Sequence, residues 1–301
     1  MRAFPLHDLS HIFFSGSEQA ASEGRAVKPR GAARSGAAPS FARRESTESS
    51  AEPDPLVRWL LEQAGVDAQI YRASPLVRRL PACLRQLRSD GPASAQALLQ
   101  RRAELVPLAL DALLIGVSEF FRDAAVFDHL QRVVLPELLR PGRPLRVCSV
   151  GSSAGQELYS LAILLAEAGA LDGAQLLGVD CRPEAVARAS RGVFPSLEGL
   201  PSAFREKYFR ADAEGWAAIE PLRRALAWET SDLFAWKNSE PWDLILFRNV
   251  AIYLTEQHTC RAWEKLTAQL APGGCIVTGK AETPPRHLQL HRSAHSVYRK
   301  P

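Results

Sequence analysis

The sequence predicts an α/β protein with an open, mostly parallel sheet, preceded by a small region made of helices alone. Two features predict this fold. From Leu145 onward, short apolar runs typical of strands alternate with segments whose apolar residues have helical spacing. Residues 55–135, in contrast, show helical spacing only. Alternating strands and helices are typical of a parallel sheet with helices on both faces.

The chain divides into three predicted parts. Residues 1–54 are expected to be a disordered tail, because residues 15–55 are rich in Ser, Ala, Gly, Pro and charge. A helical domain is expected over 55–135 and the α/β domain over 136–301. Within the helical domain, Pro81 should kink the helix in SPLVRRLPACLRQLRSDG or mark its start. The segment SEFFRDAAVFDHLQRVVLPELL is expected to form one capped helix.

The elements of the α/β domain follow in order. Strands are expected in LRVCSV, QLLGVD, ALAWETSDLF, WDLILF and CIVTGKAE, and the last segment, HRSAHSVYRK, is expected to be an edge strand. Helices are expected over 156–168 and 183–191, and in TEQHTCRAWEKLTAQLAPGG.

Composition excludes several classes of protein. No apolar run approaches the roughly 20 residues that a membrane-spanning helix needs, and the first residues lack the apolar core of a signal peptide. Five scattered cysteines without a CxxC pair are typical of buried thiols in a reducing compartment. A net charge of +4 without a recognisable motif argues against a nucleic-acid partner. We expect a cytoplasmic monomer that does not insert into membranes.

The glycine turn in VCSVGSSAGQELYS is the first candidate site. It lacks the lysine and hydroxyl of a P-loop and does not match G-x-G-x-x-G. Asp180, at the end of the second strand, can accept hydrogen bonds from both ribose hydroxyls of a nucleoside. Gln156 or Glu157 could hold an ammonium group. A nucleoside that carries an ammonium group and no phosphate, such as S-adenosylmethionine, fits both features; the alternative is an ordinary strand–turn–helix with acids on its surface.

Two further segments carry polar candidates. In SEFFRD, Ser118 and Arg122 could contact a ligand, or Ser118 could cap a helix and Arg122 could face solvent. Arg248 and Asn249 directly follow an apolar strand, where open α/β sheets bind ligands, although polar residues are also ordinary at the start of a loop.

Two groups of basic residues recur at regular spacing: the arginines could bind a partner, and the histidines could suggest a metal site. Arginines at helical spacing could form one face that receives an acidic partner, or they could simply be solvated. These arginines are Arg78, Arg85 and Arg88. Three histidines recur every four residues, but they follow Pro284-Pro285 and run into a predicted strand, so we expect no metal site. They are His287, His291 and His295.

Taken in order, these segments resemble the CheR family of chemotaxis-receptor methyltransferases over roughly residues 55–300. GVSEFFR resembles the family motif N-x-T-x-F-F-R, and GSSAGQELYS resembles A-x-S-T-G-E-E-P-Y-S. GVDCR matches the strand end T-D-I-D, and WETSDL matches F-x-x-x-N-L. FRNVAIYL resembles C-R-N-V-x-I-Y-F, and LAPGG with GKAE resembles L-x-P-G-G with G-H-S-E.

The resemblance implies a Rossmann-like class I methyltransferase fold with a seven-stranded sheet. It implies methyl transfer from S-adenosylmethionine to glutamate side chains of an acidic, helical receptor. Arg122 and Tyr253 would be the catalytic residues that orient the carboxylate or the methionine end. The match places eight residues on the cofactor: Ser118, Arg122, Gln156, Asp180, Asp232, Leu233, Arg248 and Asn249.

Several positions depart from the family pattern. Gly116 replaces the motif Asn, Gln156 the first Glu, Asp232 an Asn and Lys280 the His of G-H-S-E. Together they predict weaker cofactor affinity or a specialised member. The β-subdomain that the family inserts before the fourth strand is expected to be short here, over about 192–228, so we expect no strong dependence on a receptor tail peptide.

Two alternative functions remain at this point. A non-catalytic signalling module is favoured by Gly116 and Gln156 and opposed by the retained Arg122, Asp180 and Asn249. A methyltransferase of small molecules is opposed by the helical domain and its arginines.

Overall fold

The computed structural model describes residues 54–114, 118–140 and 143–301. The predicted tail, apart from Asp54, and Gly116 lie outside these ranges. Among the described residues no helix is both long and apolar enough to cross a membrane. All five cysteines are free thiols, as predicted, and three of them are buried.

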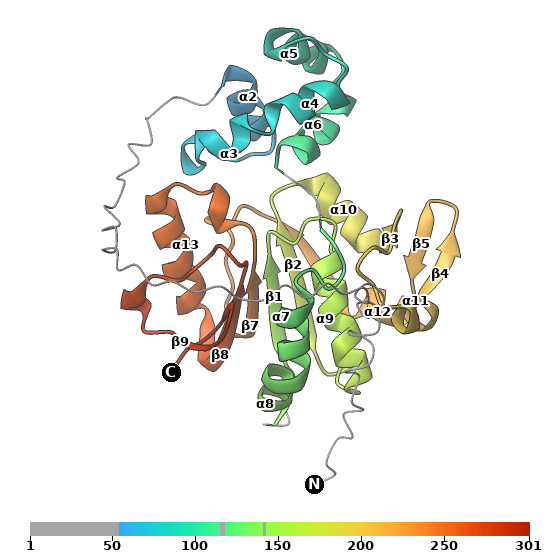
Figure 1. Cartoon of the computed structure of the whole chain (residues 1–301), viewed down its shortest axis with the longest axis vertical. Coiled ribbons are helices and arrows are strands. Elements are labelled where there is room, and N and C mark those ends of the chain that lie inside the picture. Colours follow the sequence, from blue (N-terminus) through green and yellow to red (C-terminus); the bar gives the residue numbers. More distant parts are fainter. Residues whose placement is uncertain (1–53, 115–117, 141–142) are drawn as a thin grey trace, which may run out of the picture.

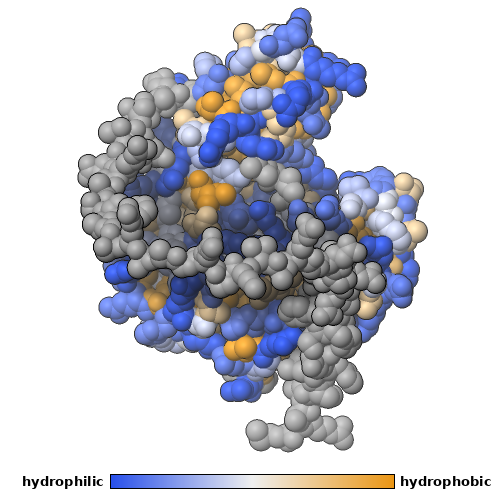
Figure 2. Space-filling view, viewed as in Figure 1, coloured by the Kyte–Doolittle hydropathy of each residue, from blue (hydrophilic) through white to orange (hydrophobic). Residues whose placement is uncertain are grey.

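The first described residues form a helical region at the end of the sheet where the parallel strands terminate (Figure 1). Asp54 caps its first helix by accepting a hydrogen bond from the backbone N–H of Leu56 at 2.9 Å. The region has its own core, which includes Leu60, Leu76 and Leu113. Figure 2 shows hydrophilic side chains along its upper rim with apolar ones among them. Its elements are α2 (Pro55–Gln63), η1 (Ala68–Ile70), α3 (Ala73–Val77), α4 (Leu80–Gln86), α5 (Pro92–Arg101), η2 (Ala103–Leu105) and α6 (Val106–Leu113).

The arginine-bearing segment is two helices, and Pro81 lies at the start of the second, which confirms one of the two roles expected of it. The break falls at Arg78 and Arg79, and Pro81 lies in the first turn of α4, where a proline costs no hydrogen bond. Arg78 is therefore between helices, Arg85 is in α4, and Arg88 follows α4 with a φ of 50°. The three arginines are all exposed, but they do not lie on one face of a single helix, as their helical spacing had suggested.

The segment predicted as one capped helix begins later than expected. The helix starts at Ala124, and Asp123 makes no capping hydrogen bond. It continues as α7 (Ala124–His129), a π-helical turn η3 (Leu130–Val134) and α8 (Leu135–Leu139). Phe120 and the apolar residues after it pack against the sheet, so the packing changes before the predicted boundary at residue 135.

A seven-stranded sheet forms the body of the molecule, in the order β6-β2-β1-β7-β8-β10-β9. The five strands from β6 to β8 are parallel, and β10 is antiparallel to both of its neighbours. The predicted α/β fold with a mostly parallel sheet is confirmed. The strands are β1 (Arg146–Val150), β2 (Gln175–Asp180), β6 (Leu226–Thr230), β7 (Trp242–Phe247), β8 (Leu270–Thr278), β9 (His291–Ala294) and β10 (Val297–Arg299).

Apolar cores cover both faces of this sheet. On one face, α7, α8 and α9 (Gln156–Glu167) pack against alternate strand residues such as Val147 and Leu246. On the other face, α13 (Glu256–Ala268) packs through Trp263 against Phe247 and Ile276. The remaining helices of the body are α10 (Pro183–Arg191), α12 (Glu220–Arg224), η4 (Ala251–Tyr253) and η5 (Arg286–Leu288).

A small second sheet lies within the region where a β-subdomain was expected. It has the order β3-β5-β4 and is antiparallel. Its elements are β3 (Val193–Phe194), α11 (Ser202–Tyr208), β4 (Phe209–Asp212) and β5 (Gly215–Ala218).

The last segment differs from its prediction. It forms a hairpin in which β9 is the edge strand and β10 lies between β9 and β8. His287 lies in η5 and His291 in β9, so the histidines do not share a helix face. Among the described residues no group of three or more acids, cysteines or histidines has the geometry of a metal site.

Candidate active site

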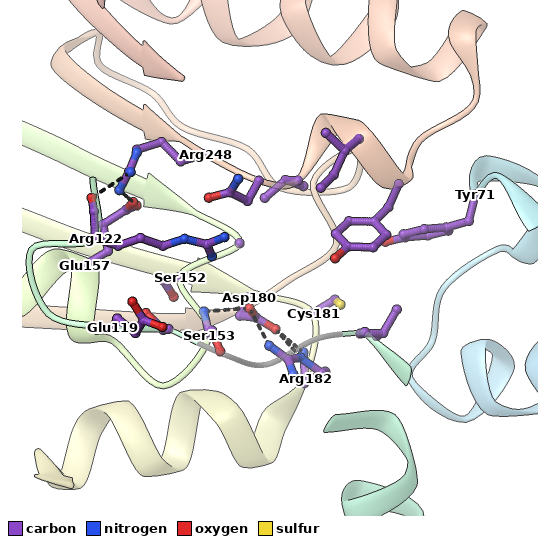
Figure 3. Close-up of a pocket in the computed structure, with 17 residues that line it drawn as sticks. Tyr71, Glu119, Arg122, Ser152, Ser153, Glu157, Asp180, Cys181, Arg182 and Arg248 are labelled. Carbon is purple, nitrogen blue, oxygen red and sulfur yellow. Dashed lines mark hydrogen bonds and ion pairs between the residues drawn. The ribbon is translucent and has the colours of Figure 1, made fainter. Parts of the chain in front are cut away.

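A cavity of about 310 Å³ lies at the carboxyl ends of β1, β2 and β7 (Figure 3). From β1 the chain crosses to β2 on one side, whereas β7 lies on the other side. Open α/β sheets bind ligands at such a reversal of strand order. The volume falls in the range of about 300–1,000 Å³ that is usual for small-molecule sites.

Most of the predicted site residues meet in this cavity. Seven of them line it: Ser118, Arg122, Glu157, Asp180, Arg248, Asn249 and Tyr253. Asp232 and Leu233 line an adjoining cavity of about 50 Å³. Gln156 lines neither cavity; its amide oxygen is buried and has no hydrogen-bond partner among the described residues.

The glycine turn forms one wall of the cavity. The backbone N–H groups of Gly151 and Ser152 both donate to the carbonyl oxygen of Val179, at 2.8 and 3.0 Å, which ties the turn to the end of β2. Gly155 has a φ of 93°, and a Cβ atom there would lie 2.6 Å from the ring of Trp228. Glycine is thus required both for the backbone angle and for the close approach.

Asp180 lies where the sequence predicted, at the end of β2, but Arg182 occupies its carboxylate. One oxygen, Oδ2, accepts from the backbone N–H of Ser153 at 2.8 Å. The other, Oδ1, accepts from the backbone N–H and the Nε of Arg182, both at 3.0 Å. Nη2 of Arg182 also reaches Oδ2 at 3.3 Å. A carboxylate offers about four acceptor positions, so ribose hydroxyls can bind here only if the guanidinium moves away.

Arg248 and Glu157 neutralise each other and do not present free charges to a ligand. Nη1 of Arg248 contacts Oε2 of Glu157 at 2.8 Å, and Nη2 contacts Oδ2 of Asp123 at 2.7 Å. Nη2 also donates to the backbone carbonyl of Arg122 at 2.8 Å. Both residues line the cavity, and the predicted contacts of Glu157 with an ammonium group and of Arg248 with the cofactor stay predictions. Their ion pair fixes the loop that carries Arg122.

Four left-handed, non-glycine residues surround the cavity, where the sequence predicted a regular helix or an ordinary loop. Such residues are uncommon and persist only where neighbours hold them. For each of the four residues, the structure shows a hydrogen bond or an ion pair with such a neighbour. Phe121 N–H donates to Ser160 Oγ at 2.9 Å, and Asn249 N–H donates to Glu282 Oε2 at 2.8 Å. The other two are Ser153, bonded to Asp180, and Asp123, bonded to Arg248.

Tyr253 lies on η4 in a loop that Glu282 organises. The Glu282 carboxylate is 5% exposed and accepts from the backbone N–H groups of Asn249, Gly279 and Ile252, at 2.8, 2.8 and 3.3 Å. Burial raises the pKa of Tyr253, while Arg79 and Arg122 act in the opposite direction. The phenol is therefore protonated at neutral pH and can donate a hydrogen bond at the cavity wall.

A family model described as CheR methyltransferase, SAM binding domain, matches residues 116–298, which is more than half of the chain. The chain belongs to the CheR methyltransferase family. It is a methyltransferase whose cofactor is S-adenosylmethionine, and its mostly parallel, seven-stranded sheet confirms the predicted class I fold.

Three curated relatives illustrate the range of this CheR family. A chemotaxis protein methyltransferase of Listeria innocua is 29% identical over 221 residues, which cover 72% of this chain and 84% of the relative. Chemotaxis protein methyltransferase 2 of Pseudomonas aeruginosa is 30% identical over 250 residues, covering 79% and 89%. A probable biofilm formation methyltransferase, WspC, of Pseudomonas putida is 32% identical over 239 residues, covering 75% and 55%.

The residues of this CheR protein fit S-adenosylmethionine in three respects. The cavity adjoins a glycine turn that has no cation for a phosphate, Asp180 faces it from the end of β2, and a buried amide oxygen of Gln156 next to the turn has no partner among the described residues. Among the residues that sequence reasoning did not single out are Tyr71 and Arg182, which line the cavity, and Glu282, which holds the loop that carries Tyr253. Arg182 was detectable because it follows Asp180 so closely, and Glu282 lies in the quoted GKAE segment. No motif marks Tyr71.

Proposed function

We propose that this protein methylates glutamate side chains on the acidic, helical part of a chemotaxis or chemotaxis-like receptor in the cytoplasm and forms glutamate methyl esters. The observation that carries the proposal is the meeting of Arg122 and Tyr253 with the glycine turn and Asp180 on the wall of one cavity. The names of the Listeria innocua and Pseudomonas aeruginosa relatives support a role in chemotaxis, whereas that of the Pseudomonas putida relative mentions biofilm formation.

The chemistry of the cavity favours a carboxylate as the methyl acceptor. Bound S-adenosylmethionine supplies a methyl group on a positively charged sulfur. A glutamate side chain has an ordinary pKa of about 4.3, so it is already a nucleophile at neutral pH and needs no general base. No histidine is present among the described residues that line the cavity, which agrees with this requirement.

Arg122 and Tyr253 are suited to orient such a carboxylate. Figure 3 shows the Arg122 side chain extending toward the middle of the cavity. The protonated phenol of Tyr253 can donate one hydrogen bond, and the guanidinium can donate two in a planar fork. Because in-line methyl transfer depends on alignment, these contacts contribute mainly by positioning the oxygen.

The helical region offers a basic surface to an acidic receptor. Arg78, Arg85 and Arg88 are all exposed, although Arg78 lies between α3 and α4, Arg85 lies in α4 and Arg88 follows α4. Exposed charges of one sign speed the encounter with a partner of the opposite sign, and salt screens this effect.

Transfer of a labelled methyl group tests the proposal. With labelled cofactor and a purified cytoplasmic receptor fragment, we expect label that base releases as methanol, because esters hydrolyse in base. Replacing the receptor's acceptor glutamates by glutamine should abolish the label. Label that is stable to base, or label found only on small molecules, would contradict a glutamate acceptor. No binding of S-adenosylhomocysteine would instead support a non-catalytic module.

Charge reversal tests the basic surface. The double variant Arg78→Glu, Arg85→Glu should slow receptor methylation while cofactor binding stays unchanged. Arg140→Glu is the matched control, because Arg140 is also exposed but follows α8, at the opposite end of the molecule (Figure 1). Equal rates for both variants would place the receptor surface elsewhere.

A further inference from the structure

The helical region contributes to the wall of the cofactor cavity. Tyr71 and Leu114 line the larger cavity, and both precede residue 116, where the match to the cofactor-binding family model begins. Tyr71 also lines the smaller cavity, so its ring lies where the two cavities adjoin. Figure 3 shows Tyr71 projecting from the helical region toward Asp180 and Cys181.

Backbone hydrogen bonds fix the position of Tyr71. The N–H of Arg72 donates to the carbonyl oxygen of Tyr253, and the N–H of Thr255 donates to that of Ile70, both at 2.8 Å. Tyr71 itself pairs with Leu254 in an isolated antiparallel bridge. The backbone at Tyr71 is therefore held by the same loop that carries Tyr253, so its Cα has a fixed position at the cavity wall.

The surroundings of the phenol show what it can do. Burial is the main cause that raises the pKa of Tyr71, and the nearby Cys181, Asp232 and Asp180 raise it further. The hydroxyl is consequently a hydrogen-bond donor, and Tyr71 lines the smaller cavity together with two acids, Asp180 at the end of β2 and Asp232 just after β6. Asp180 is the acid suited to a ribose, so the phenol lies beside the ribose position.

A second connection from the helical region reaches the same acid. Asp111, on α6, contacts Arg182 at 2.9 Å and Arg188 at 2.7 Å. Arg182 in turn contacts Asp180 at 3.0 Å. The helical region thus contacts Asp180 through Asp111 and Arg182, and Tyr71 shares the lining of both cavities with that acid.

We propose that Tyr71 binds the cofactor, with its ring against the adenosine part and its hydroxyl donating a hydrogen bond beside Asp180. The helical region is then part of the cofactor site as well as a surface for a partner. This inference depends on the cofactor and not on the identity of the methyl acceptor.

Calorimetry on the full chain with S-adenosylhomocysteine and with adenosine tests this role. Tyr71→Ala should weaken both ligands at least about tenfold, because it removes a packed ring and a donor. Tyr71→Phe keeps the ring and should weaken both about three- to tenfold, the usual effect of one hydrogen bond. Tyr208→Phe is the control: this tyrosine is also buried, but its hydroxyl contacts Glu167, away from the cavity, so we expect unchanged affinity.

Two results would overturn the proposal. One is wild-type affinity for both ligands in a folded Tyr71→Ala variant. The other is a loss for S-adenosylhomocysteine without a loss for adenosine, since the contact is then at the methionine end. If Tyr71→Ala does not fold, Tyr71→Phe decides: wild-type affinity in that variant would overturn the hydroxyl contact.

Discussion

Gly199→Ala is expected to disturb the cofactor site although Gly199 lines neither cavity. Gly199 precedes α11 and has a φ of 79°. A Cβ atom there would lie closer than 3.0 Å to the backbone carbonyl oxygen of Phe120. Phe120 belongs to the segment that carries Ser118 and Arg122 into the cavity. Because the obstacle is backbone, the whole segment must shift to accept the methyl group.

The size of the effect can be separated into two parts. A left-handed, non-glycine residue costs on the order of 1–2 kcal/mol, and overpacking a well-packed site costs about 1–3 kcal/mol more. Gly169→Ala isolates the first part, since Gly169 has a φ of 65° and nothing lies within 4 Å of its added methyl group. The Gly199 variant should therefore be about 1–3 kcal/mol less stable than the Gly169 variant.

Urea unfolding and calorimetry with S-adenosylhomocysteine measure both consequences. We expect Gly199→Ala to bind the ligand more weakly than wild type, and Gly169→Ala to bind it equally well. Equal stabilities for the two variants would refute the steric argument. Wild-type affinity in Gly199→Ala would show that Phe120 can move without moving Arg122.

Three further predictions concern groups that hold the site together. Arg182→Ala should cost about 3–5 kcal/mol of stability, because it leaves a buried carboxylate without its partner. It should nevertheless tighten S-adenosylhomocysteine binding several-fold, since the ribose hydroxyls no longer have to displace the guanidinium. Calorimetry that shows a loss of affinity like that of Asp180→Ala would contradict this. Ser160→Ala removes the acceptor for the Phe121 N–H, so urea unfolding should show a loss of about 1–3 kcal/mol, with weaker ligand binding; an unchanged affinity would separate Phe121 from the site. Burial raises the pKa of Glu282 above the ordinary value of a glutamate despite its backbone partners. Its contribution to stability is therefore complete below that ordinary value and is lost as the pH rises through the raised pKa. The unfolding free energy of wild type should accordingly fall relative to Glu282→Gln over that range, and a constant difference from about pH 4 to about pH 8 would argue against it.

The sequence predicted the elements of the fold more reliably than the geometry of its loops. Strands such as β1 and β2 were predictable because apolar periodicity is a local property of the chain. The left-handed backbone at Phe121 and Asp123 was not, because its stabilising partners are distant: Ser160 lies 39 residues from Phe121, and Arg248 lies 125 residues from Asp123. A periodic pattern contains no information about such contacts.

The same limit applies to the residues that bear charge at the site. The positions of Asp180, Arg248 and Asn249 near strand ends correctly predicted that they line the cavity, because parallel strands end at one edge of the sheet. Their roles depended on partners that spacing does not show. Arg248 is paired with Glu157, 91 residues away, and Asp180 with Arg182, only two residues away.

A network of charged residues explains two departures from the family pattern, Lys280 and Gln156. Lys280, Asp123, Arg248 and Glu157 form a chain of alternating charges, with contacts of 2.6, 2.7 and 2.8 Å between successive members. Burial would raise the pKa of Asp123, but Lys280 and Arg248 together hold it below its usual value. A lysine keeps this pairing at neutral pH, where a histidine would be largely uncharged. The two cations balance the two acids of this network. A neutral Gln156 next to Glu157 in the sequence leaves these charges matched, whereas a glutamate at position 156 would add an acid that has no cation in the network.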